Sequence, residues 1–526
     1  MHTLDYPPSF AFFEYFLSNN PITKAFVAYG VLDGSCFALL GDAENDVGMD
    51  CVIFQRCTVI LADAVFILGA MALSRSLFHG SSGKKEEDDD TRTHAVSCTV
   101  LVVANSGIIL LDHIHFQYNG MLLGILMASL ACLLQSMKSK STNTESTKLE
   151  LLGAITFAFL LTFKHLYLTL APIYFFYLLR RFCFEDNGGT GARFVFPRLV
   201  LLGSAVVITL LIPFLPFIMD GKDQMLQMLS RLFPFQRGLC HDYWAGNVWA
   251  IYLFMEKIAN FLSKADSLLG GGGRGSHAFV RTVVNIGMVP KVSNLLSKAL
   301  PFPEITPLVA AILLFIGLTP AMYCAWKIAS NTRTTVLHSK TRQEAFLYCT
   351  VYSSITSFML AYHVHEKAIM TAIVPMTFLA FSSKEGARLF LRMSAVGQFG
   401  LLPLLYKPTE LLIKILLNLC YLVLCIYILE TVHSDSNNNN INSGSNGLLL
   451  LRDKIGLFIM GCLLTYTEVI HGSVFDSDEM QFLPLMLTSL YCALGLFGCW
   501  IHCGKIMLQK VAVDGKIPPN CLENNI

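Results

Sequence analysis

The sequence predicts an all-α polytopic membrane protein, and two properties of the chain indicate this class. Of its 526 residues, 54% are hydrophobic and only 14% are charged, whereas about 25% of the residues of soluble domains are charged. The apolar residues also gather in runs that reach the roughly 17–25 residues needed to cross a bilayer as a helix. We therefore expect a single multi-span membrane domain over residues 1–526, with about thirteen transmembrane helices.

The predicted spans follow one another in two series that are separated by a long loop. The first series lies near 52–73, 95–111, 119–135, 149–163, 166–179 and 198–218. The second lies near 305–327, 345–361, 368–382, 389–405, 411–430, 455–471 and 481–502. The apolar stretch 149–179 divides at residues 163–165, because Lys164 and His165 are costly inside a membrane and are tolerated at its interface.

The distribution of Lys and Arg predicts the orientation of these spans, since basic residues favour the cytosolic side. With a luminal N-terminal segment, the connections rich in Lys and Arg alternate onto the cytosolic face, and the polar motifs fall on the other face. Residues 1–51 and the long loop 219–304, with its interfacial helices, are then luminal. Polar loops at 74–94 and 431–454 are cytosolic, and the charge run KKEEDDD (84–90) is a solvated part of the first.

Charge and cysteine usage exclude other classes of protein. The net charge is +1, which gives no electrostatic basis for binding nucleic acid. The sixteen cysteines form no CxxC pair and lie mostly in apolar runs. They are interpreted as small core residues rather than as a disulfide framework or a zinc site.

The luminal motif DHIHFQYNG (112–120) contains a carboxylate and two alternating histidines. His113 and His115 have the spacing of ligands on an extended strand, so a metal site is one interpretation. A hydrogen-bonded interfacial turn is the interpretation that these residue types favour, because neutral histidines more often orient or donate hydrogen bonds.

Two later motifs combine basic and aromatic side chains. The stretch SRLFPFQRGLCHDYWAGNVW (230–249) offers arginines, which suit phosphate, and tryptophans, which suit sugar rings. A basic and aromatic belt at the membrane interface is the alternative. The stretch HVHEK (363–367) gathers two histidines, a Glu and a Lys before a span. These groups suit a phosphate at the membrane surface, although Glu366 and Lys367 alone could be an interfacial ion pair.

Transfer of a sugar from a lipid phosphate needs this combination of groups. The phosphodiester leaving group needs cations or hydrogen-bond donors, and the acceptor hydroxyl needs one general base, such as an Asp or Glu. A transporter would have a similar hydropathy. Its polar residues should lie in span centres and recur in two halves, whereas here they lie mainly at span ends without an internal repeat.

Five motifs in order resemble the endoplasmic-reticulum glucosyltransferases that use dolichyl phosphate glucose and share the multi-span GT-C fold. They are LDYPP (4–8), DHIHFQYNG (112–120), FKHLYL (163–168), RLFPFQRGL (231–239) and HVHEKAI (363–369). The resemblance continues more weakly through PLLYKPTELLIKILL (403–417) to the last span. It implies an inverting, metal-independent hexosyltransferase without a cofactor, in the endoplasmic-reticulum membrane, with its active site facing the lumen.

The resemblance also implies the substrates. The family has one branch that adds the first glucose to the lipid-linked oligosaccharide and another that adds the second in α-1,3 linkage. RGLCHDYWAGNVWA (237–250), His165 and Ile114 are similar to the second branch. Expected partners are dolichyl phosphate glucose, the dolichyl-diphosphate-linked oligosaccharide and the bilayer. Expected substrate-binding residues are Tyr6, His113, His115, Gln117, Asn119, Lys164, His165, Arg231, Arg237, His241, Trp244, His363, His365, Glu366 and Lys367.

The family also has a first helix and a luminal acidic motif whose Asp is the expected base, and LDYPP ends that loop. We therefore expect this chain to lack the first family helix and that base, and to be an incomplete chain or a natural short form. Asp5 and Asp112 are the candidate substitutes, although Asp5 could instead cap a helix that starts near Pro8. Alternative functions are first-glucose transfer and a non-catalytic short form that binds lipid-linked sugar.

Overall fold

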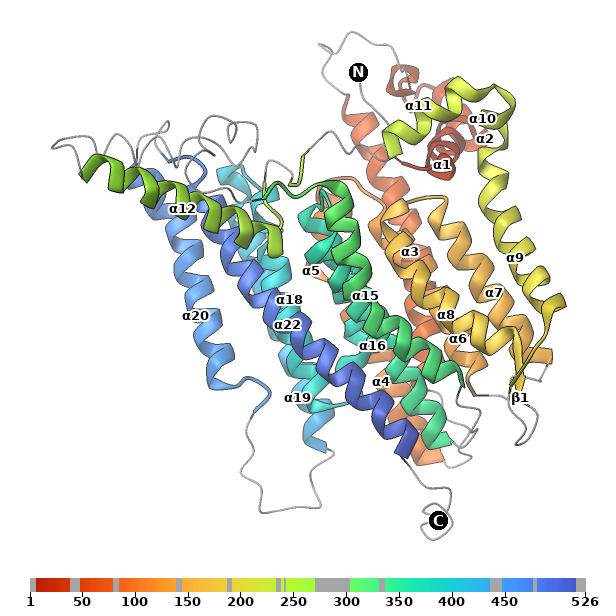
Figure 1. Ribbon diagram of the computed structural model, residues 1–526. Coiled ribbons are helices and arrows are strands. Elements are labelled where there is room, and N and C mark those ends of the chain that lie inside the picture. Colours follow the sequence, from red (N-terminus) through yellow and green to blue (C-terminus); the bar gives the residue numbers. More distant parts are fainter. Residues whose placement is uncertain are drawn as a thin grey trace. The chain divides into compact units, whose positions relative to one another are not determined.

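The computed structural model describes residues 6–37, 48–78, 85–138, 144–186, 192–232, 238–240, 243–269, 303–330, 336–435, 447–475 and 480–516. The chain divides into two compact units. Unit 1 contains Met1–Pro234 and Ile328–Gln343, and unit 2 contains Phe235–Lys327 and Glu344–Ile526. Helices build both units (Figure 1), so the predicted all-α class is confirmed. The expectation of a single domain stays a prediction.

Unit 1 is formed mainly by the N-terminal half of the chain. Among its described residues, two short antiparallel strands pair just before α9, beside the N-terminus of that helix (Figure 1). Its elements are α1 (Pro8–Asn19), α2 (Pro21–Ala28), η1 (Gly34–Phe37), α3 (Met49–Phe78), α4 (Lys85–Val103), α5 (Ser106–Ile108), the π-helix η2 (Ile109–Ile114), α6 (Asn119–Ser136), α7 (Thr144–Leu161), η3 (His165–Leu170), α8 (Ala171–Phe182), β1 (Phe184–Asp186), β2 (Ala192–Phe194), α9 (Phe196–Leu211), η4 (Ile212–Phe214), α10 (Leu215–Met219) and α11 (Lys222–Leu232).

Unit 2 is formed mainly by the C-terminal half, and α12 lies across the helix ends of this unit rather than along them (Figure 1). Its elements are α12 (Val248–Leu269), α15 (Pro307–Ser330), α16 (Val336–Leu360), η7 (Glu366–Ile369), α17 (Met370–Ala380), α18 (Lys384–Phe399), η8 (Leu402–Leu404), η9 (Pro408–Glu410), α19 (Leu411–Asp435), α20 (Leu451–Thr465), the π-helix η10 (Tyr466–Ile470), α21 (His471–Val474) and α22 (Leu483–Lys516). The last residues of α15 and the first residues of α16 belong to unit 1.

Every predicted span coincides with helical structure. Among the described residues, eight helical segments are long and apolar enough to cross a membrane, so a multi-pass membrane protein is confirmed. Others are shorter, such as α8 with 12 residues and α17 with 11, and the number thirteen stays a prediction. The predicted break is confirmed, because α7 ends at Leu161 and η3 begins at His165.

The sequence-based expectation for the charge run was wrong. Residues 85–90 of KKEEDDD form the first turns of α4 rather than a loop, which agrees with the preference of acidic residues for helix N-termini. Helices also extend into both predicted cytosolic loops, since α3 continues to Phe78 and α19 to Asp435, and α20 begins at Leu451.

The cysteine prediction also needs one correction. Cys36 and Cys51 form a disulfide between η1 and the first turn of α3. The fold places the two Cα atoms 5.6 Å apart, which the linear spacing does not reveal. Most of the free cysteines that the structure describes are buried in helices, as expected of small apolar residues.

The central contact of unit 1 is between α3 and α6. A Cβ atom added at Gly69 would collide with the backbone of Gly124, and one added at Gly124 would collide with the backbone of α3. The two backbones therefore approach as closely as small-residue helix contacts in membranes allow. Leu126 and Leu130 of α6 are fully buried. This packing fixes the position of α6, whose first turn carries the polar motif residues.

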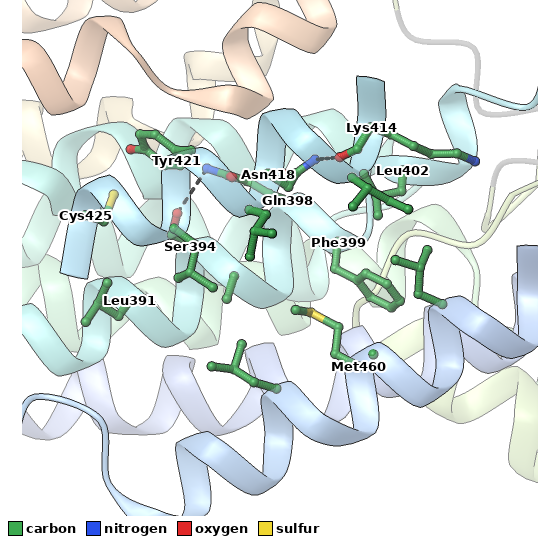
Figure 2. Close-up of a pocket in the computed structure, with 17 residues that line it drawn as sticks. Leu391, Ser394, Gln398, Phe399, Leu402, Lys414, Asn418, Tyr421, Cys425 and Met460 are labelled. Carbon is green, nitrogen blue, oxygen red and sulfur yellow. Dashed lines mark hydrogen bonds between the residues drawn. The ribbon is translucent and has the colours of Figure 1, made fainter. Parts of the chain in front are cut away.

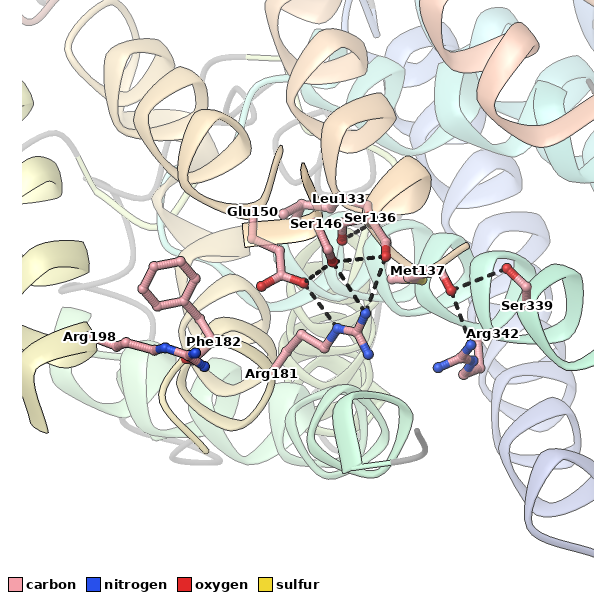
Figure 3. A network of polar contacts seen from close by, with 10 residues as sticks. All are labelled: Leu133, Ser136, Met137, Ser146, Glu150, Arg181, Phe182, Arg198, Ser339 and Arg342. Atoms are coloured by element: carbon pink, nitrogen blue, oxygen red, sulfur yellow. Dashed lines mark hydrogen bonds and ion pairs between the residues drawn. The ribbon is translucent and has the colours of Figure 1, made fainter. Parts of the chain in front are cut away.

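The C-terminal end of α6 is closed by a buried polar network (Figure 3). Arg181 donates to Glu150 over 3.0 Å and to the Ser136 carbonyl over 3.1 Å. Arg342 and Ser339 donate to the Met137 carbonyl. Cations at this end stabilise the unpaired carbonyls of a helix C-terminus.

Candidate functional site

Three of the sequence motifs meet in unit 1 around the N-terminus of α6. Asp112 lies in η2 and is 1% exposed. Its carboxylate accepts hydrogen bonds from the backbone N–H of Asn119 (3.0 Å), the Asn119 amide (2.9 Å) and the backbone N–H of Gly120. The two backbone N–H groups are donors that a helix N-terminus leaves unpaired. Asp112 therefore caps α6 from a neighbouring element, and both of its oxygens are engaged.

Asn119 connects this carboxylate to the second motif, FKHLYL. Lys164 donates from Nζ to Asn119 Oδ1 over 2.8 Å, and Asn119 Nδ2 also donates to Gln117 Oε1 over 2.9 Å. Lys164 is 9% exposed and immediately precedes η3. An ammonium held beside a carboxylate, in a largely dry position, provides a fixed positive charge. His165 begins η3 and is half-buried.

The third motif, DYPP, brings Tyr6 to the same cluster. The Lys164 ammonium lies 5.9 Å from the Tyr6 ring centroid, within the range of a cation–π contact. Pro7 is extended and Pro8 begins α1, as predicted. Ser9 donates from its backbone N–H and its hydroxyl to Thr162, over 3.1 and 2.8 Å. These bonds fasten the start of α1 to the end of α7 and so hold Tyr6 in place.

The DHIHF histidines have different surroundings. His113 Nε2 lies 3.1 Å from Asp63 Oδ2 of α3. His115 is half-buried, and its buried Nε2 has no hydrogen-bond partner in the described part of the chain. The residue after it, Phe116, has a φ of 52°, a region that costs free energy for a bulky side chain. The two imidazoles therefore differ in their partners, since His113 pairs with Asp63 whereas the buried His115 Nε2 has none among the described residues.

The motif analysis missed Asp63. It lies in the middle of an apolar span, and the signal that could have identified it is its charge, since an ionisable residue inside a membrane span is a functional candidate by default. Asp63 orients the His113 ring through its hydrogen bond. His113 can then present its other nitrogen, Nδ1, to a ligand.

Tyr118 adds a hydroxyl next to the cluster. It lies 2.9 Å from the Thr58 hydroxyl of α3 and packs edge-on against the Phe13 ring of α1. Burial raises the pKa of Tyr118 to about 12, so its hydroxyl keeps its proton at neutral pH. Aromatic rings from α1 therefore cover one side of the motif turn.

The other two motifs meet in unit 2. His363 has a φ of 54°, and its backbone N–H donates to the Leu239 carbonyl over 2.9 Å. Its Nδ1 lies 3.0 Å from the Gly238 carbonyl, and Cys240 pairs with Val364 in a β-bridge. The RGLC and HVHEK segments are thus joined by backbone bonds, although more than a hundred residues separate them in the chain.

The remaining HVHEK residues follow this turn directly. The His365 ring lies 5.8 Å from the His363 ring, nearly perpendicular to it. Glu366 begins η7 and is 6% exposed, whereas His365 and Lys367 are half-buried. The two imidazoles and the Lys367 ammonium are half-exposed groups that suit an anion, beside one buried acid.

Trp244 and Arg231 have contrasting surroundings. Trp244 is 1% exposed in the apolar cluster with Trp249 and Ala493, and its carbonyl accepts from Ser489 over 2.6 Å. This burial favours packing. Arg231 is exposed in the last turn of α11. Predicted residues Asp5, Arg237 and His241 lie outside the described residues.

The group of side chains that could hold a metal ion contains none of the motif residues. Within the described ranges, one set of three residues brings metal-binding atoms together, namely Cys36, Asp50 and Cys51. Its two sulfurs are joined to each other in the disulfide. His113 and His115 are not in this set. The expectation of a metal-independent protein stays a prediction.

Comparisons with known proteins agree with the chemistry of these clusters. Residues 1–503 match the model of the ALG6, ALG8 glycosyltransferase family. The chain is 32% identical to the Bos taurus dolichyl pyrophosphate Glc1Man9GlcNAc2 alpha-1,3-glucosyltransferase over 503 residues, which cover 95% of this chain and 85% of the relative. It is 34% identical to the Mus musculus protein of the same name, over 95% and 84% of the two chains. An Arabidopsis thaliana relative of that name is 32% identical, over 95% and 86%.

Proposed function

We infer that this chain, which belongs to the ALG6, ALG8 glycosyltransferase family, transfers glucose in α-1,3 linkage to the Glc1Man9GlcNAc2 oligosaccharide on dolichyl pyrophosphate. The observation that carries this inference is the similarity to three relatives of that name over 95% of the chain. The reaction belongs to the assembly of the dolichol-linked precursor for N-glycosylation.

We propose dolichyl phosphate glucose as the donor. The acceptor hydroxyl oxygen attacks the anomeric carbon, and the bond from that carbon to the phosphate oxygen breaks. The electron pair of that bond leaves on dolichyl phosphate, and the hydroxyl proton passes to a general base. Such a single displacement inverts the anomeric centre. The leaving phosphate needs fixed positive charge or hydrogen-bond donors, and each unit, taken by itself, has a polar cluster with such groups.

In unit 1, we propose that His115, His113 and Lys164 contact substrate. Support comes from the buried Nε2 of His115, from the Asp63 carboxylate that orients His113, and from the buried ammonium of Lys164. The engagement of both Asp112 oxygens favours a positioning function for Asp112. Its selection as a general base stays a prediction, as does that of Asp5.

In unit 2, we propose that His363, His365 and Lys367 contact a phosphate group. Support comes from the turn at His363, which costs backbone strain and is held by bonds to Gly238 and Leu239. Strained residues of this kind concentrate at functional sites. Glu366 is a buried acid in the same segment.

We propose that the motif-bearing turns face the endoplasmic-reticulum lumen and that the chain crosses the membrane about thirteen times. The Cys36–Cys51 disulfide at the start of α3 supports this orientation, because disulfides persist in oxidising compartments. A glycosylation sequon inserted after Gly221 should be modified, and one inserted between β1 and β2 should not. The reverse pattern would invert the proposed topology.

Glucose transfer by the full chain tests the proposed activity. The chain is placed in membranes that lack both family activities, with dolichyl phosphate glucose and either unglucosylated or monoglucosylated lipid-linked acceptor. We expect transfer to the monoglucosylated acceptor alone. Transfer to the unglucosylated acceptor would assign the first-glucose branch, and no transfer by a folded, inserted chain would favour a non-catalytic lipid-sugar-binding form.

A matched pair of variants sharpens this assay. Lys367→Met should lower transfer about 100-fold, as expected when a charge that stabilises the leaving group is removed. Lys407→Met removes an exposed ammonium in the loop after η8 and should leave transfer unchanged. Equal activity of the two variants would exclude Lys367 from the substrate site.

A further inference from the structure

Unit 2 contains a cavity of about 340 Å³ between α18, α19 and α20. Figure 2 shows Phe399, Leu402 and Met460 directed into this space from different elements. Its few polar side chains have partners of their own, since Gln398 donates to Ser394 Oγ over 3.0 Å and Asn418 donates to the Lys414 carbonyl over 2.9 Å. The walls therefore suit an apolar occupant.

Ion pairs connect α20 to its neighbours near its two ends, on either side of the cavity. Lys414 of α19 lies 2.6 Å from Glu468 in η10, and Arg392 of α18 lies 3.4 Å from Asp453 in the first turn of α20. Between these ion pairs, α20 carries Gly461, and a Cβ added there would meet open space. The helix is held at both ends and unpacked in its middle.

The surroundings of α20 supply a natural occupant for this space. Both α19 and α20 are within segments that can cross a membrane, and α20 exposes Phe458 at 72% and Ile455 at 51%. These side chains face bilayer hydrocarbon when the helix spans the membrane. An empty apolar cavity loses packing contacts, so a hydrocarbon chain from the bilayer gains contacts by entering.

We propose that this cavity binds one acyl chain of a zwitterionic phospholipid, which fills the space behind α20. A volume of about 340 Å³ lies at the lower end of the roughly 300–1,000 Å³ of ligand pockets. It suits a single unbranched chain better than a long, methyl-branched polyprenyl chain. The Lys414–Glu468 pair at one end is neutral overall, and the buried Lys414 ammonium is already bonded to Glu468 and to the Leu405 carbonyl. This pair therefore offers no excess positive charge that would favour an anionic headgroup over a zwitterionic one.

Photolabelling of the full chain in phosphatidylcholine nanodiscs tests the proposal. One probe is phosphatidylcholine with a diazirine on its acyl chain, and the other is a polyprenyl phosphate with a diazirine on its tail. We expect the acyl probe to label cavity-lining Met460 and Leu464 as well as exposed Phe458. Labelling of Phe458 alone, or labelling of the cavity walls by the polyprenyl probe instead, would overturn the proposal.

Filling the cavity gives the matched comparison. Gly461→Leu should abolish labelling of Met460 and keep labelling of Phe458. Gly498→Leu, at an exposed glycine of α22 that also has open space, should change neither. Equal labelling of Met460 in both variants would contradict the proposal. Ala395→Leu, which enters the same cavity from α18, provides the same test if Gly461→Leu does not fold.

Discussion

Charged side chains complement the helix dipole at both ends of α6, but the polar residues next to these charges differ in their exposure. Asp112 places a negative charge at the N-terminus, and Arg181 places a positive charge at the C-terminus, as the helix dipole favours. At the C-terminal end, the Arg181 and Glu150 side chains are 2% and 1% exposed and bind each other. At the N-terminal end, half-exposed His113, His115 and Gln117 adjoin the cap.

This difference in exposure distinguishes the C-terminal network, which stabilises the fold, from the N-terminal cluster, which can also contact a ligand. Burial of a charged group alone does not mark a functional site, because a buried ion pair can occur without any ligand to bind. The N-terminal cluster is distinguished by its half-exposed imidazoles and by the strained Phe116 next to them. An unpartnered buried atom does not distinguish it, because Glu150 Oε2 of the C-terminal network also lacks a hydrogen-bond partner among the described residues. Variants at the two ends should therefore affect different properties.

The largest effect is expected at the C-terminal end. Arg181→Met leaves Glu150 buried without its partner and should lower the free energy of unfolding by about 3–5 kcal/mol, measured by denaturant titration in detergent. Transfer per folded molecule should be unchanged. The double variant Arg181→Met, Glu150→Leu should recover most of the loss. A single variant as stable as the parent chain would contradict the structural role of this network.

A smaller loss of stability is expected at the N-terminal cap. Asp112→Asn keeps the shape of the side chain and removes its charge. The new side-chain NH2 group replaces one of the two acceptor oxygens and must then face a donor N–H of Asn119 or Gly120. The free energy of unfolding should fall by about 1.5–3 kcal/mol, together with transfer, because Asn119 and Lys164 lose their support. Asp223→Asn, at an exposed position of α11, is the matched control and should change stability by less than about 0.5 kcal/mol.

Substitution of His115 should affect glucose transfer more than stability. Because its Nε2 has no partner among the described residues, His115→Ala should change the free energy of unfolding by less than about 1 kcal/mol. Transfer should fall about tenfold or more if the imidazole stabilises the leaving phosphate. The comparison of initial rates with thermal unfolding separates the two properties. A destabilised variant with full activity per folded molecule would assign His115 to the fold.

The smallest effect is expected at Asp63. Asp63→Asn retains an acceptor for the His113 N–H and loses about 1 kcal/mol of a charge-assisted bond, so kcat/KM should fall about two- to fivefold. Asp63→Leu removes the acceptor and should lower kcat further, with KM nearly constant, because His113 loses its orientation. Rescue by Asn but not by Leu identifies a positioning function. Identical kinetics for both variants would exclude it.

Sequence alone determined the class of the protein and the positions of its helices. Runs of apolar residues are a local property, and a bilayer requires helices of a certain length, so every predicted span coincides with helical structure. The break before His165 followed from the cost of two polar residues in a membrane. The charge run at 85–90 was misassigned, because a helix can extend beyond the membrane when its first turn is acidic.

Only the tertiary structure decided which motif residues act together. Asp112 and Lys164 are linked through Asn119, and His363 is bonded to Gly238, because packing brings distant segments into contact. Linear spacing carries no information on such partners. For the same reason, Asp63 was missed, the Cys36–Cys51 disulfide was not foreseen, and Trp244 proved to be buried. The chemistry of the motifs was readable from residue types, whereas their partners depended on the close approach of helices such as α3 and α6.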